Sequence, residues 1–152
     1  MSEPDNADRR ALATFLASDG MPAPMDSSPL LGALGCRIEG AGEGWVRLSF
    51  TPGAQHVQGN GVVAGGIVAT MLDFALAFAG LTTCNPGGSA VSIGLNVCFL
   101  GPVRAEKVVV HATLAASGYR IAQAEAKISD LEGRTLATAT GALSMKRNKK
   151  SQ

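Results

Sequence analysis

The sequence has little charge and almost no net charge. Asp, Glu, Lys and Arg make up 16% of its 152 residues, and 13 basic against 12 acidic residues leave a formal net charge of +1 at pH 7. A nucleic-acid-binding protein usually concentrates basic residues on one face, so this balance argues against that class. The length suits one domain with a real core, and the 46% hydrophobic share is typical of a globular chain.

Cysteine and histidine are scarce as well. Three Cys residues without C-x-x-C spacing (Cys36, Cys84 and Cys98) indicate reduced thiols in a cytoplasmic protein rather than disulfides or a zinc site. Neither His has a set of metal-binding neighbours. We expect His111 to be structural or on the surface, while His56, near a Gly-rich loop, is either solvated or a substrate contact.

A signal peptide and a membrane anchor are not expected. The N-terminus lacks a basic start, an apolar core and a small-residue cleavage site. The stretch 61–84 is long enough to cross a bilayer. However, Asp73 at its middle would cost about 2.5–3.5 kcal/mol on insertion scales, and its many Gly and Ala residues add little hydrophobicity.

The order of expected elements predicts the α+β class. A short helix over 7–18, a Pro- and Ser-rich loop and a helical turn at 29–35 precede two strands near 36–40 and 44–50. A long apolar helix over 65–82 follows, and then four strands over 90–100, 107–116, 119–129 and 134–145. A helix before an antiparallel meander is not an alternating βαβ pattern. We expect an extension (1–29), one domain (30–146) and a flexible tail (147–152).

The long helix is apolar on nearly every side, which predicts a sheet wrapped around it. One stripe is large and should pack on the sheet, namely Ile67, Met71, Phe74, Phe78 and Leu81. The neighbouring stripe is small and would let a ligand or another backbone approach, namely Gly66, Thr70, Asp73, Ala77 and Gly80. Asp73 must be satisfied, either structurally by backbone amides or an Arg, or in a functional site.

The Gly-rich loop 59–66 places unhindered backbone amides just before this helix. The N-terminus of a helix stabilises anions and developing oxyanions. Such amides and a carboxylate on one helix are parts of an acyl-transfer site. Gly65 and Asp73 are about 12 Å apart at 1.5 Å per residue, too far to act on one carbonyl. We therefore expect a second subunit, with its helix antiparallel, to complete the site.

Two segments resemble a known family. The run "GVVAGGIVATMLDFA" (61–75) is similar to the loop and helix of hotdog-fold acyl-CoA thioesterases, particularly the phenylacetate-pathway type. Gly61, Gly65, Gly66 and Asp73 fit its spacing, whereas Ala64 and Gln58 stand where the family has His and Asn. The run "AVSIGLNVCFLGPVRAEKV" (90–108) resembles the family strand that carries a Ser and ends in a Pro turn. The resemblance covers roughly 30–145.

The resemblance implies an α+β hotdog fold, an acyl-CoA substrate, no cofactor apart from that coenzyme A, and a homodimer or homotetramer. Asp73 would be the general base or the nucleophile, and the N–H of Gly65 would polarise the thioester carbonyl. Gln58 would orient water or substrate, and Ser92 would line the site and bond to the water or the carboxylate. The expected substrate contacts are His56, Asn60, Gly66, Thr70, Met71 and Phe74.

Other functions stay open. A non-catalytic acyl-CoA-binding protein could share the fold. A hotdog dehydratase would want a catalytic His, which Ala64 does not supply. The run "GNGVVA" matches a loose dinucleotide pattern, but it lacks the preceding strand and the later acid. Arg104 and Lys107 would either meet coenzyme A phosphates or form a solvated face.

Overall fold

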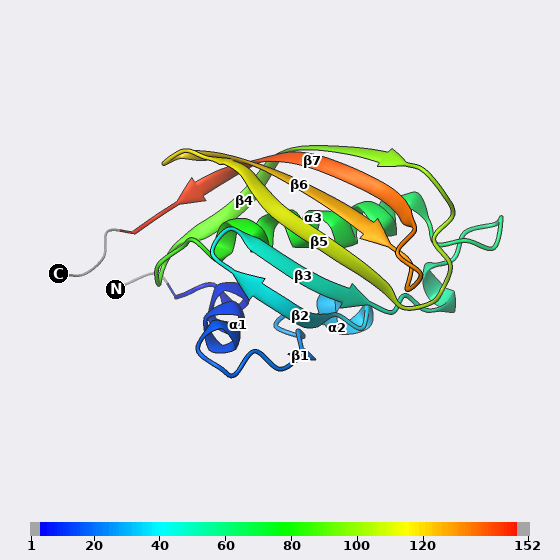
Figure 1. Cartoon of the computed structure of the whole chain (residues 1–152), viewed down its shortest axis with the longest axis horizontal. Coiled ribbons are helices and arrows are strands. Elements are labelled where there is room, and N and C mark those ends of the chain that lie inside the picture. Colours follow the sequence, from blue (N-terminus) through cyan, green and yellow to red (C-terminus); the bar gives the residue numbers. More distant parts are fainter. Residues whose placement is uncertain (1–3, 149–152) are drawn as a thin grey trace.

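A computed structural model describes residues 4–148. One antiparallel sheet, ordered β1-β2-β3-β5-β6-β7-β4, curves around helix α3 (Gly65–Leu81) (Figure 1). The strands are β1 (Ala23–Pro24), β2 (Arg37–Gly42), β3 (Trp45–Phe50), β4 (Ser89–Phe99), β5 (Val108–Ser117), β6 (Ile121–Ser129) and β7 (Thr135–Lys146). Helices α1 (Ala7–Leu16) and α2 (Pro29–Ala33) lie beside β1 and β2. The predicted α+β hotdog fold is confirmed.

Helix α3 is buried because apolar side chains cover most of its circumference. Its fully buried positions include Val68, Leu72, Ala75, Leu76 and Ala79, which recur at helical spacing and face the sheet. The face that packs is therefore wider than predicted. Within the predicted large stripe, Ile67 and Phe74 are only half-buried, and within the small stripe Gly80 is buried.

Strand β4 differs from its predicted alternation. Its register against β7 shifts between Ser92 and Gly94, which is a β-bulge. The bulge moves Ser92 to the face that looks at α3 and places Leu95 beside Gly141, on the same inner face. Asn96 and Cys98 face outward. An extra residue inverts the pattern beyond it, so the prediction that Val91 and Leu95 share one face was wrong.

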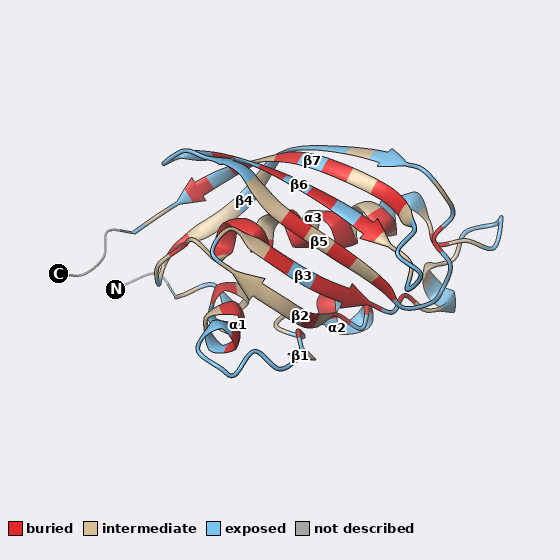
Figure 2. Cartoon of the chain, in the orientation of Figure 1, coloured by how far each residue is buried: buried red, intermediate tan, exposed pale blue. Residues whose placement is uncertain are grey.

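The two edges of the sheet are unlike. Edge strand β1 has two residues and contains Pro24, which has no N–H to donate. Edge strand β4 has 11 residues without Pro or Lys, and it is mostly exposed or half-buried (Figure 2). The exposed fraction is 42% for Leu95 and 55% for Phe99. The chain thus blunts one edge and leaves the other open.

The N-terminal extension packs on this body. Helix α1 is capped by Asn6, and its buried Leu12 and Phe15 join the core. Arg9 pairs with Asp5 at 2.6 Å, and Asp5 accepts a hydrogen bond from the N–H of Gly87 at 2.9 Å. These bonds fasten the extension to the loop after α3.

The last described residue lies beside the same loop, because the Asn85 side chain donates to the carbonyl of Asn148 at 2.9 Å. In the expected flexible tail, the Arg147 side chain donates to Ser117 and to the carbonyl of Tyr119, while residues 149–152 lie outside the described residues. No helix within residues 4–148 is both long and apolar enough to span a membrane.

Candidate functional site

The N-terminus of α3 presents free amides. Its N-cap is Ala64, which offers no side-chain acceptor, and Gly65 and Gly66 are exposed. Within residues 4–148, no group accepts a hydrogen bond from the N–H of Gly65 or Gly66. Helix termini leave such donors unsatisfied, and a side chain usually caps them. This terminus can therefore accept an anion or a developing oxyanion.

The loop before the helix is held by backbone hydrogen bonds. Val63 donates to the carbonyl of Val103 at 2.7 Å, and Ala64 donates to that of His56 at 2.9 Å. The His56 ring accepts the N–H of Gly53 at Nδ1, 3.0 Å away. His56, expected as a substrate contact, thus anchors the loop that precedes the free amides.

Asp73 lies on the small stripe of α3 and is hydrogen-bonded to Ser92 of β4. Ser92 donates its hydroxyl proton to Oδ1 of Asp73 at 2.5 Å, and both residues are half-buried. Neither an Arg nor a backbone N–H donates a hydrogen bond to Asp73 among the described residues, so Ser92 takes the place of the partners that the structural alternative named. The second carboxylate oxygen remains available to a ligand.

The other expected site residues are spread out. Gln58 and Asn60 are exposed in a protruding loop, where the Gln58 side chain accepts the N–H of Asn60 (Figure 1). Thr70 donates to the carbonyl of Gly66 at 2.8 Å. Met71 is fully buried in the core, while Phe74 is half-buried and its ring lies 5.7 Å from that of Phe78. The structure thus brings Asp73 together with Ser92, whereas no hydrogen bond joins Gln58 to either of them among the described residues.

Phe99 is the site neighbour that sequence reasoning missed. A β-carbon at Gly65 would lie 3.3 Å from Cζ of the Phe99 ring, so the ring rests against the first residue of α3. Strand β4 runs antiparallel to α3, since Ala90 lies at Gly80 while Phe99 lies at Gly65. No local pattern marks Phe99 in the sequence, because its place depends on the bulge.

Other titratable groups lie away from these residues. His111 is half-buried and stacks on Trp45 with 6.0 Å between ring centroids, and burial lowers its pKa. The described residues contain no group of three His, Cys, Asp or Glu that could hold a metal ion.

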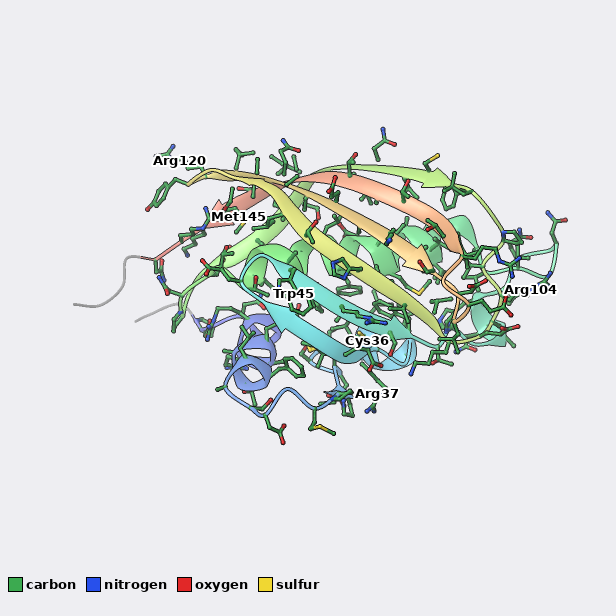
Figure 3. All side chains as sticks on the ribbon, in the orientation of Figure 1. Cys36, Arg37, Trp45, Arg104, Arg120 and Met145 are labelled. Carbon is green, nitrogen blue, oxygen red and sulfur yellow. The ribbon has the colours of Figure 1, made fainter. Side chains whose placement is uncertain are left out.

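A hollow of about 460 Å³ lies between the segment 100–108 and the β6–β7 turn. Its Arg104 lies toward the end where α3 begins (Figure 3).

Comparison with known proteins places the chain in a family. The family model of the thioesterase superfamily matches residues 60–137. A Pseudomonas aeruginosa protein that is provisionally classed as an esterase is 32% identical over 119 residues, which cover 76% of this chain and 87% of that one. The chain belongs to the thioesterase superfamily.

Solved structures agree with this assignment. A thioesterase from Haemophilus influenzae is 26% identical, with a TM-score of 0.71 over 77% of this chain and 82% of that one. The PaaI protein from the phenylacetic acid degradation operon of E. coli is 25% identical, with a TM-score of 0.70 over 76% of this chain and 86% of that one. The resemblance to PaaI-like hotdog thioesterases is thus confirmed.

Proposed function

We propose that the chain is an acyl-CoA thioesterase that hydrolyses the thioester to a free acid and coenzyme A. The observation that carries the proposal is the Asp73–Ser92 pair on the open face of α3, with uncapped amides at the start of the same helix. Membership of the thioesterase superfamily supports this reaction class. The reaction needs no cofactor beyond the coenzyme A of the substrate.

Asp73 activates water in this proposal. Ser92 occupies one carboxylate oxygen, and the other takes a proton from the water as its oxygen attacks the carbonyl carbon. The N–H of Gly65 stabilises the negative oxygen that forms. The C–S bond then breaks, and coenzyme A leaves as the thiol after taking up a proton. If Asp73 attacks directly, a mixed anhydride forms first and water cleaves it.

The site is shared between two copies of the chain. Gly65 and Asp73 are separated by about 12 Å along α3, so one carbonyl cannot reach both within one chain. The open β4 edge offers a place for a second copy, because an unpaired long edge strand is a template for pairing with another chain. We therefore propose a homodimer through β4, which could associate further into a homotetramer.

The proposal keeps a substrate-binding role for most, but not all, of the residues that the resemblance assigned to substrate contacts. Gln58 and Asn60 are exposed and would approach a ligand held by a second copy. The exposed Gly66 and the half-buried Thr70 and Phe74 would contact the substrate on α3. The proposal gives Met71 no substrate contact, because it is fully buried. The three free cysteines support a cytoplasmic location.

The test is thiol release from a panel of aromatic and straight-chain acyl-CoAs. We expect wild type to turn over part of the panel and Asp73→Asn to lose about 100-fold or more in kcat. Asp26→Asn, an exposed Asp in the loop before α2, is the matched control and should keep full activity. If wild type binds acyl-CoA without turning it over, the proposed enzymatic function is contradicted and a non-catalytic acyl-CoA-binding protein is favoured. That alternative is raised by Ala64 and Gln58, which stand where the family has His and Asn.

A further inference from the structure

We infer that Phe99 forms the wall of the thioester site and contacts the first carbons of the acyl group. This inference rests on the proposed thioesterase function. It begins from the contact of the Phe99 ring with Gly65, whose amide would bind the carbonyl oxygen. The ring therefore lies next to the place where the reacting carbon must be.

Phe99 differs from an ordinary core residue because much of its side chain is exposed. A single exposed apolar side chain needs no explanation. Phe99, however, is 55% exposed while one end of its ring rests on Gly65, the first residue of α3, so the ring stands beside the helix terminus and presents its remaining surface outward. The absence of a side chain at Gly65 is what lets the ring approach.

The same face of β4 continues the apolar surface toward the carboxylate. Leu95 and Val97 lie between Phe99 and Ser92 on the inner face of the strand, and Leu95 is 42% exposed. The strand rises about 3.3 Å per residue, so these side chains cover about 13 Å. One apolar strip thus joins the amide end of the site to the carboxylate end.

The bulge limits the registers that an antiparallel pair of β4 strands can adopt. In an antiparallel β4 pair, residues that face each other must lie on the same face of the joined sheet. We adopt the register that pairs Asn96 with its own copy, which satisfies this because it matches Gly94 with Cys98 on the outer face and Leu95 with Val97 on the inner face. Phe99 then lies opposite the bulge of the second copy, beside the Ser92 that holds Asp73. The ring stands between the amides of one chain and the carboxylate of the other.

The experiment compares two substrates in each variant. The ratio of kcat/KM for hexanoyl-CoA to that for acetyl-CoA reports contacts with the acyl chain and cancels any general loss of activity. Each methylene group packed on the ring is worth about fourfold. We expect Phe99→Ala to lower the ratio about tenfold and Phe99→Leu, which keeps an apolar side chain, to restore most of it.

Leu100→Ala is the matched control. Leu100 is the next residue and is similarly exposed, but the three atoms nearest to a β-carbon at Gly65 all belong to the Phe99 ring, so removing the Leu100 side chain should leave the ratio within about twofold of wild type. An unchanged ratio in Phe99→Ala would overturn the inference even if both activities fell, because a merely structural role lowers both alike. If wild type hydrolyses neither these esters nor any other acyl-CoA, the proposed function fails instead.

Discussion

The three cysteines show how position alone sets the chemistry of a residue. Burial raises the pKa of Cys36 to about 12 and also raises that of Cys84, whereas Cys98 is exposed on the outer face of β4. The thiolate is the reactive form, so a buried thiol with a raised pKa is inert near neutral pH. Because these pKa values are higher in the folded state, the neutral thiols stabilise the fold fully below the unfolded pKa near 9. That contribution is lost as pH rises through the folded values.

This difference predicts one reactive cysteine per chain. We expect iodoacetamide at pH 8 to modify Cys98 in the native protein and all three cysteines in urea, with mass spectrometry of peptides as the measurement. Equal labelling of Cys36 under native and denaturing conditions would contradict the burial described for it.

At the scale of one element, α3 contains one tightly packed glycine, Gly80, and one glycine with free space around it, Gly66. A β-carbon at Gly80 would lie 2.9 Å from Cδ1 of Leu143 and 3.0 Å from the β-carbon of Ala90, whereas one at Gly66 would meet nothing within 4 Å. Gly80→Ala should therefore lower the free energy of unfolding by about 1–3 kcal/mol through overpacking. Gly66→Ala should leave it unchanged or raise it by up to about 1 kcal/mol, because Ala is the better helix former. Urea unfolding of both variants measures the contrast, and equal effects would contradict the close packing at Gly80.

The same scale shows where sequence reasoning reaches its limit. The helix over 65–82 was predictable to within one residue because its apolar composition and the following Asn-Pro-Gly-Gly are local signals. The bulge at Ser92–Gly94 was not, since it depends on how β4 registers against β7, a partner more than 40 residues away. Asp73 could be singled out as the lone charge in the helix. The family resemblance also placed Ser92 in the site as a partner of the water or the carboxylate, and Ser92 donates a hydrogen bond to Asp73. The contact of Phe99 with Gly65, in contrast, required the register.

For the whole molecule, the register inferred for two β4 strands predicts a specific cross-link. Residues directly opposite in an antiparallel pair have β-carbons about 4.5–5.5 Å apart, close to the reach of a disulfide. In a Cys98→Ser background, Asn96→Cys should form a covalent dimer on mild oxidation, seen on a non-reducing gel. Ser144→Cys in the same background is the control, since it is exposed on β7 rather than on the open edge. A Ser144→Cys dimer without one from Asn96→Cys would contradict the register.

The blunt β1 edge has a consequence for how far assembly can proceed. The β4 edge is the longest uncovered strand edge among the described residues, and two chains that join through β4 would cover it in both. The joined sheet then ends at β1 on either side, where Pro24 has no N–H to donate to the strand of a further chain. Such a contact is isologous, because the same surface of both chains takes part in it, and each chain can therefore bind only one partner through it. In the proposed dimer, raising the protein concentration would fill this contact without extending the sheet into a ribbon of chains.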